Sequence, residues 1–160
     1  MMANKRGPCT ILMADDDADD CLLVREALRE AKQPHDLRVV RDGQQLLDYL
    51  RRLGEYQQSP DVPRPDLILL DLKMPRKDGR EALSEVKADP RLRSIPIVVL
   101  TTSTAHDDIG FCYRMGVNSY ITKPATFRGL VDLLATVSKY WFELVELPVV
   151  ELERHRGPIE

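Results

Sequence analysis

Several polar side chains of this sequence stand directly after short apolar runs, where each run ends. Continuous apolar runs of four or five residues are typical of strands that are buried on both faces of a parallel sheet. The carboxyl ends of such strands meet at one edge, where α/β proteins bind their ligands. We therefore expect one shared site at that edge. The polar residues that follow such runs are Asp15, Asp16, Asp71, Thr101 and Lys123.

These residue types favour phosphoryl chemistry with a metal ion. Two carboxylates about 4 Å apart repel by roughly 4 kcal/mol at an effective dielectric constant near 20, and a bound cation removes that cost. An all-oxygen group formed by Asp15, Asp16 and Asp71 favours Mg²⁺ over Zn²⁺. A carboxylate such as Asp71 can attack phosphorus to form an acyl phosphate. The ammonium of Lys123 and the hydroxyl of Thr101 can then each bind a phosphoryl oxygen.

The elements that must position these residues alternate regularly along the chain. Five expected strands are each followed by a stretch with helical spacing of apolar residues, which predicts an α/β fold with a doubly wound, five-stranded parallel sheet. A segment with one glycine and three prolines, 54–65, is expected to be a loop. The last helix is expected to begin near Thr126 and to carry one apolar stripe. The expected strands are 10–14, 37–40, 67–70, 97–100 and 119–122, and the stripe is Phe127, Leu130, Leu134, Val137, Trp141 and Leu144.

Four sequence motifs, in order, resemble the receiver domain of two-component response regulators. They are the acidic pair in ILMADDDADD, the aspartate in LILLDLKMPRKDG, the hydroxyl residue in IPIVVLTTS, and the aromatic and lysine in SYITKP. A single Asp-Asp pair is a weak signal, whereas this ordered set is specific. The resemblance covers about 10–139, which is most of the chain.

The resemblance implies a flavodoxin-like receiver fold with strand order 2-1-3-4-5 and assigns a role to each site residue. By this resemblance, Asp15, Asp16 and Asp71 hold Mg²⁺ together with the backbone carbonyl of Lys73. Asp71 is the residue phosphorylated by a histidine kinase, and Thr101 and Lys123 bind the phosphoryl group. The aromatic switch is Tyr120, which fills the space that Thr101 leaves when it moves toward the phosphate.

The chain divides into an N-terminal segment 1–9, a receiver domain 10–139 and a C-terminal extension 140–160. The extension is too short for a DNA-binding or enzymatic effector, so we expect output through contacts of the receiver itself. Its apolar residues either fold back on their own domain or form a homodimer, and we favour the homodimer. These residues are Tyr140, Trp141, Phe142, Leu144 and Val145, with 149–152 beyond Pro148. The extension and the loop 54–65 resemble the small regulators that are paired with bacterial phytochrome kinases, which implies a light-sensing kinase as partner.

Two other functions compete with a signalling receiver. A haloacid-dehalogenase-type phosphatase also uses an aspartate nucleophile and Mg²⁺, but its D-x-D-x-[TV] signature fails at Asp19. A phosphorylation-independent adaptor would need no intact acidic site. A receiver promotes only its own phosphorylation and dephosphorylation, so we do not expect an enzyme acting on other substrates.

Several polar residues have simpler explanations. Asp17, Asp19 and Asp20 are expected to cap the first helix, because carboxylates stabilise the positive end of a helix dipole. The three histidines lack ligand spacing and are expected on the surface. The three cysteines are expected to be buried, reduced fillers.

Composition limits the class of protein further. The chain has 160 residues, 43% of them hydrophobic and 31% charged, and a net charge of −3. This balance gives no electrostatic footprint for nucleic acid. No signal peptide is expected, and no apolar run reaches the ~18 residues that cross a bilayer. We therefore expect a cytoplasmic protein that binds neither nucleic acid nor membrane.

Overall fold

A computed structural model describes residues 8–59 and 61–149 of the chain. Five parallel strands form one sheet in the order β2-β1-β3-β4-β5, which confirms the predicted fold class and strand order. The strands are β1 (Thr10–Ala14), β2 (Asp36–Val40), β3 (Leu67–Leu70), β4 (Ile97–Thr101) and β5 (Ser119–Thr122). Strands β3 and β4 are fully buried, as expected for inner strands with helices on both faces.

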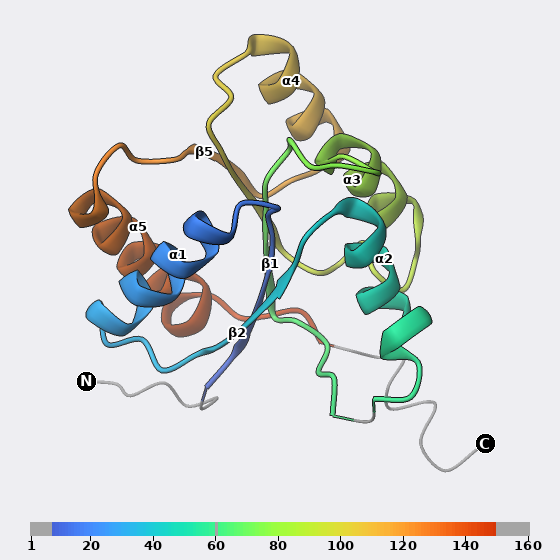
Figure 1. The fold of residues 1–160 in the computed structure, drawn as a ribbon, viewed down its shortest axis with the longest axis horizontal. Coiled ribbons are helices and arrows are strands. Elements are labelled where there is room, and N and C mark those ends of the chain that lie inside the picture. The colour runs from blue at the N-terminus through green and yellow to red at the C-terminus, as the bar shows by residue number, and fades with distance from the viewer. Residues whose placement is uncertain (1–7, 60, 150–160) are drawn as a thin grey trace.

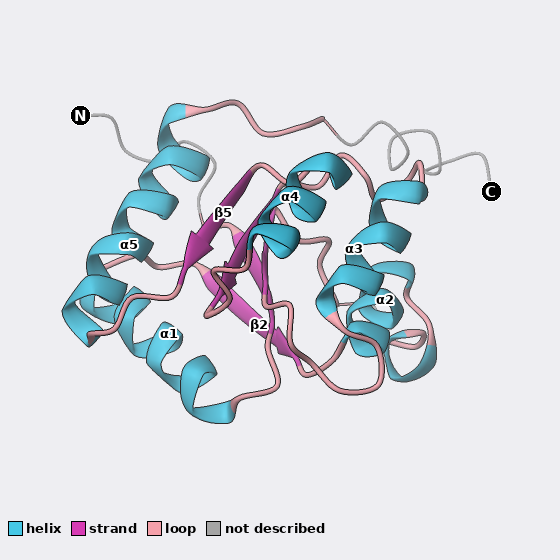
Figure 2. Cartoon of the chain, turned by 90° about the horizontal axis from the view of Figure 1, so that it is seen from above, coloured by secondary structure: helices cyan, strands magenta, loops and turns pink. Residues whose placement is uncertain are grey.

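Helices cover both faces of the sheet (Figure 1). Helices α1 (Ala18–Glu30) and α5 (Phe127–Lys139) pack together on one face. Helices α2 (Gly43–Arg51), α3 (Gly79–Ala88) and α4 (His106–Met115) lie on the other. Figure 2 shows α2 and α3 on the opposite side of the strands from α1 and α5. Each group buries one apolar cluster against the sheet. Within the described part of the chain, no helix is long and apolar enough to cross a membrane.

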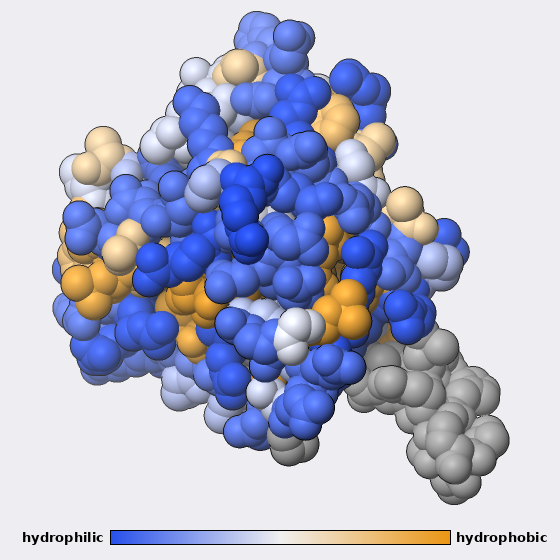
Figure 3. Space-filling view, turned by 45° about the vertical axis from the view of Figure 1, so that its right-hand side comes forward, coloured by the Kyte–Doolittle hydropathy of each residue, from blue (hydrophilic) through white to orange (hydrophobic). Residues whose placement is uncertain are grey.

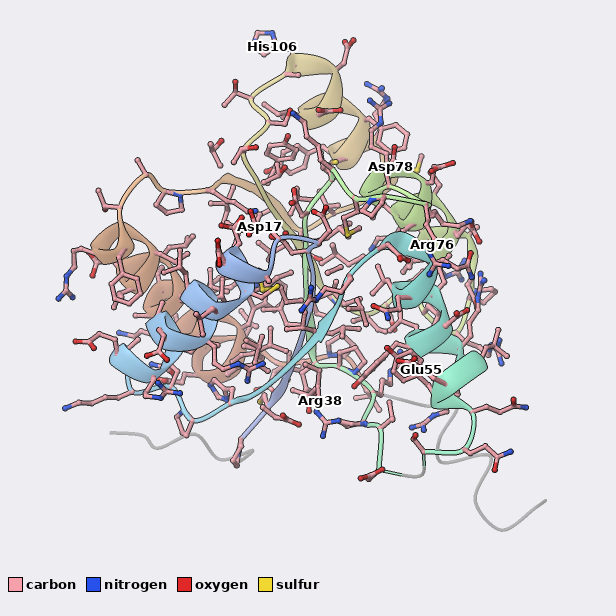
Figure 4. The ribbon with its side chains drawn as sticks, viewed as in Figure 1. Asp17, Arg38, Glu55, Arg76, Asp78 and His106 are labelled. Carbon is pink, nitrogen blue, oxygen red and sulfur yellow. The ribbon has the colours of Figure 1, made fainter. Side chains whose placement is uncertain are left out.

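Local chemistry fixes where the helices begin. Asp17, Asp42 and Asp78 are the N-caps of α1, α2 and α3, and each carboxylate accepts backbone N–H groups of the first turn. Asp78 also forms a capping box with Glu81. Figure 4 labels Asp17 and Asp78 at the starts of their helices. Since these helices follow β1, β2 and β3, the caps also fix the loops at the site edge of the sheet.

Helix α2 is shorter than its apolar spacing predicted. The helix ends at Arg51, because Arg52 adopts a left-handed conformation (φ 57°). Leu53, which continues the helical spacing of the apolar residues Leu46, Leu47 and Leu50, lies outside the helix and is 47% exposed. The segment 54–65 is a loop, as predicted, apart from a single 3-10 turn at Gly54–Tyr56. Pro60 lies outside the described residues.

The end of the last helix also differs from the prediction. Helix α5 passes into a π-helical turn, Tyr140–Leu144, in which the Val145 N–H donates to the Tyr140 carbonyl. The buried face of this segment carries Val131, Leu134, Val137, Ser138 and Phe142. Phe127 and Leu144, the two ends of the predicted stripe, are exposed. Phe127 lies at the first position of α5, and Leu144 departs from the stripe because the 3.6-residue period does not hold across a π-turn.

Candidate functional site

The register of the sheet brings the predicted site residues to one edge. Ala14 pairs with Leu70 across β1 and β3, so Asp15 and Asp71 leave the sheet side by side. Thr101 pairs with Thr122 across β4 and β5. Lys123 follows Thr122 directly, and its N–H donates to the Thr101 carbonyl. Parallel pairing therefore gathers residues that are up to 108 positions apart in the chain.

Three carboxylates form the acidic part of this site. Asp15, Asp16 and Asp71 each offer one oxygen, and the three oxygens lie within 4.8 Å of one another. Asp15 and Asp71 are buried, whereas Asp16 is exposed. Burial raises the pKa of Asp15 above its ordinary value, although hydrogen bonds from Lys123 and from the Asp17 backbone oppose this. Converging hard oxygen donors at this spacing fit a divalent cation such as Mg²⁺ or Mn²⁺.

Asp71 is held on one side by hydrogen bonds and is only 8% exposed. Its Oδ1 accepts from the Thr101 hydroxyl and from the Leu72 N–H, both at 2.7 Å. Its Oδ2 faces the Lys123 ammonium at 3.4 Å. These contacts fix the orientation of the carboxylate before a ligand binds. The entropy cost of orienting it for a reaction is therefore small.

The Lys123 ammonium lies among three carboxylates. Its Nζ is 2.8 Å from Asp15 Oδ2, 2.7 Å from Asp20 Oδ2 and 3.4 Å from Asp71 Oδ2. Burial would lower the pKa of Lys123, but the hydrogen bonds to Asp15 and Asp20 outweigh it and raise the pKa above its ordinary value. Lys123 is therefore a permanent positive charge beside the acidic group.

Asp20 was assigned only a capping role from sequence, and this assignment is incomplete. Asp17 accepts the N–H groups of Asp19 and Asp20 and is the cap of α1, as predicted. Asp20 stands in the first turn of the helix and is not its cap; its carboxylate accepts from the Lys123 ammonium. Because the two residues are 103 positions apart, no local pattern could pair them.

Tyr120 is linked to the loop that follows β4. Its hydroxyl donates to the Ser103 carbonyl at 2.9 Å, and its ring packs against the apolar cluster under α2, α3 and α4. The Ser103 hydroxyl donates to Asp108 of α4, and Asp108 also accepts from Arg80 of α3. Sequence analysis missed Ser103, because a serine in a run of Thr and Ser residues carries no distinguishing signal.

The loop between β3 and α3 carries Lys73 and is tied to α2. The Gly43 N–H donates to the Lys77 carbonyl at 2.7 Å, and a Cβ at Gly43 would lie only 2.3 Å from that carbonyl oxygen. Arg76, labelled in Figure 4 beside the start of α2, donates two hydrogen bonds to Asp42. Lys73 has an exposed side chain two residues after Asp71. The metal-binding role of the Lys73 carbonyl stays a prediction.

The remaining candidate residues have structural roles. Cys9, Cys21 and Cys112 are buried, as predicted. His106 is exposed, as expected. His35 was expected on the surface, and this was wrong: it is half-buried, its Nδ1 accepts the Cys9 N–H at 3.0 Å, and its ring lies 4.5 Å from that of Phe142. His155 lies outside the described residues.

The fold and the site together define a class of protein, and comparison with known proteins identifies it. The sequence model of the response regulator receiver domain matches residues 11–135. This chain therefore belongs to the response regulator receiver domain family. Receiver domains are partners of sensor histidine kinases and bind a divalent metal ion.

Individual relatives narrow the class further. Response regulator Rcp1 of Synechocystis sp. is 43% identical over 141 residues, which are 88% of this chain and 94% of Rcp1. The phosphorylated cyanobacterial phytochrome response regulator RcpA superposes with a TM-score of 0.82 at 43% identity, over 89% of this chain and 100% of that structure. A Mn²⁺-bound form of Rcp1 superposes with a TM-score of 0.80 at the same identity and coverage. The chain is thus similar to single-domain phytochrome response regulators.

Proposed function

We propose that Asp71 accepts a phosphoryl group from a histidine kinase and that the phosphorylated receiver signals through protein–protein contacts. One observation carries this proposal: a buried carboxylate that is held by Thr101 and Leu72 lies between two further aspartates and a lysine. Membership of the receiver family supports it, because phosphorylation by a histidine kinase is typical of that family.

The reaction follows from the groups around Asp71. A carboxylate oxygen of Asp71 attacks phosphorus, an O–P bond forms, and the N–P bond of the kinase phosphohistidine breaks, leaving the neutral imidazole of the kinase after protonation. Lys123 and the Thr101 hydroxyl, which contact Asp71 before the reaction, are each placed to donate to a phosphoryl oxygen. Hydrogen bonds from these two groups would stabilise the negative charge on the phosphoryl oxygens.

We propose Mg²⁺ as the resident cation, held by Asp15, Asp16, Asp71 and the Lys73 carbonyl. The three carboxylates and the Mn²⁺-bound form of Rcp1 support a divalent ion at this place. When bound, Mg²⁺ supplies positive charge that neutralises phosphoryl oxygens. The protein residues provide the oxygen donors and keep the acidic group open on the side of Asp16, which is exposed.

The proposed output starts at Thr101 and Tyr120. When the Thr101 hydroxyl turns from Asp71 to the phosphoryl group, it leaves space beside β4, and Tyr120 moves into that space. Tyr120 must then release the Ser103 carbonyl, which belongs to the loop before α4. A local charge change would thus alter the surface formed by α4 and β5.

The wider setting of the protein is also part of this proposal. We propose a phytochrome-type histidine kinase as donor, supported by the likeness to RcpA, and a cytoplasmic location. We propose the division into 1–9, 10–139 and 140–160, with a homodimer formed through the C-terminal helix and extension and no binding of nucleic acid. Residues 1–7 and 150–160 of this division lie outside the described residues.

Intact-protein mass measured after incubation with acetyl phosphate tests the proposal directly. Wild type in Mg²⁺ is expected to gain a single phosphate, which chelation of the metal abolishes. Asp71→Asn is expected to gain none, because an amide is not a nucleophile toward phosphorus, and to keep its fold. Asp66→Asn is the control, since Asp66 precedes the same strand and lies at its opposite end, where it accepts the Thr10 N–H. Modification that persists in Asp71→Asn would refute the assignment.

A further inference from the structure

The Lys123 ammonium is bound more closely by Asp20 than by the proposed phosphoacceptor. We propose that Asp20 is a positioning residue that competes with the phosphoryl group for Lys123 and thereby slows phosphorylation of Asp71. This inference rests on the proposed function of Asp71. It concerns a residue outside the group of carboxylates that can hold the metal, which comprises Asp15, Asp16 and Asp71.

The distances around Nζ show how the lysine is occupied. An ammonium has three N–H donors. Two of them are used at 2.7 Å and 2.8 Å by Asp20 and Asp15, and the contact with Asp71 is longer, at 3.4 Å. A strong hydrogen bond to a phosphoryl oxygen on Asp71 therefore requires Lys123 to weaken one of its two short contacts.

Burial decides which of the two short contacts gives way. The Asp15 side chain is 1% exposed, accepts the Asp17 N–H and is a proposed ligand of Mg²⁺, so its carboxylate stays in the site and cannot turn to water when Lys123 moves. The Asp20 side chain is 33% exposed, and water can replace the lysine there at low cost. Asp20 is therefore the partner that releases Lys123, and its attraction for the ammonium adds to the barrier for phosphoryl transfer.

Removing the charge of Asp20 should therefore accelerate the reaction. Asp20→Asn keeps the size of the side chain, and its amide attracts an ammonium less strongly than a carboxylate does. We expect phosphorylation by acetyl phosphate at saturating Mg²⁺ to be about 1.5- to fivefold faster, the range for a partly exposed ion pair. We expect beryllofluoride, an analogue of the phosphoryl group, to bind more tightly by a similar factor. Asp20→Glu keeps the charge and should retain the slow rate.

Asp19→Asn is a matched control for this experiment. Asp19 is exposed in the same first turn of α1 and carries the same charge, but Lys123 contacts Asp20 and not Asp19. Removing either charge reduces the repulsion of an anionic donor by this surface, and of the two residues only Asp20 also contacts Lys123. The Mg²⁺ affinity of each variant, measured by calorimetry without donor, shows whether metal binding has changed.

The outcomes separate this inference from the proposed function. A faster rate in Asp20→Asn alone, with unchanged Mg²⁺ affinity, supports the inference. Equal acceleration in Asp19→Asn and Asp20→Asn overturns it in favour of general charge repulsion, and an unchanged or slower Asp20→Asn overturns it as well. Both results would leave the role of Asp71 intact. Absence of phosphate from Asp71 in the wild type would instead refute the proposed function and this inference together.

Discussion

At the scale of single residues, the Thr101 hydroxyl is the group that links the acidic site to β4. It donates to Asp71 over 2.7 Å, and both side chains are buried. Thr101→Val keeps the shape of the side chain but removes the donor. We expect the free energy of unfolding to fall by about 1 kcal/mol and phosphorylation by acetyl phosphate to slow by roughly tenfold, because one donor to the phosphoryl oxygens is lost.

Thr101→Ser provides the control, since it retains the hydroxyl and removes only a methyl group. Chemical denaturation and phosphorylation rates, measured on the same preparations, separate stability from reactivity. If Thr101→Val reacted as fast as Thr101→Ser, the proposed contact between this hydroxyl and the phosphoryl group would be excluded.

The site residues that follow the strands could be predicted from sequence, whereas a site residue on a helix, Asp20, could not. Asp15, Asp71, Thr101 and Lys123 meet because each follows an apolar run and parallel pairing brings those ends together. Asp20 follows no run: it occupies a helical turn where carboxylates ordinarily stabilise the dipole. Its pairing with Lys123 depends on the packing of α1 against α5 and the sheet, which is a property of the tertiary structure.

At the scale of elements, the π-helical turn Tyr140–Leu144 shows where periodicity stops being informative. The sequence identified the last helix and most of its buried face but wrongly included Phe127 and Leu144, which are exposed. Phe142 is only 1% exposed and belongs to the same apolar cluster as β1 and α1. Trp141 and Leu147 pack against that cluster. Part of the extension thus folds back on its own domain, which was the alternative to a homodimer in the sequence analysis.

The contact between His35 and this turn predicts a dependence of stability on pH. Burial lowers the pKa of His35 below its ordinary value of 6.5, although Asp66 and Glu143 oppose this. Its Nδ1 accepts the Cys9 N–H, and a protonated imidazole cannot accept there. The unfolded chain therefore takes up the proton first as the pH falls. The stabilisation is complete above pH 6.5 and is lost as the pH falls through that value and through the lower pKa of the folded state.

We expect the loss to be about 1 kcal/mol, the usual contribution of one hydrogen bond. His35→Asn, which keeps an acceptor and cannot titrate, should lack this part of the pH dependence, whereas His106→Asn should keep it because His106 is exposed. Urea denaturation of the three proteins between pH 8 and pH 5 measures the difference. Parallel curves for wild type and His35→Asn would contradict the prediction.

At the scale of the whole molecule, exposed apolar side chains remain near the C-terminal end of α5. The face in Figure 3 is largely hydrophilic, with small separate apolar patches. Tyr140 and Leu144 are 50% and 65% exposed on the π-turn, and Val149 is also exposed. The fold already buries Phe142. In the described part of the extension, these three are therefore the large apolar residues that remain exposed for contact with a partner. A homodimer formed through them would remove this apolar surface from water.

Point substitutions test that dimer better than truncation before Tyr140, because truncation would also remove Phe142 from the core. The double variant Tyr140→Glu, Leu144→Glu adds charge to the proposed interface and leaves the core intact. Sedimentation velocity is expected to show a dimer for wild type and a monomer for this variant, with a dissociation constant weakened by about a hundredfold or more for two disrupted central contacts. Leu53→Glu is the matched control, because Leu53 is an exposed apolar residue near the end of α2. A dimer that survives in the double variant would place the interface elsewhere, and a wild-type monomer would exclude it.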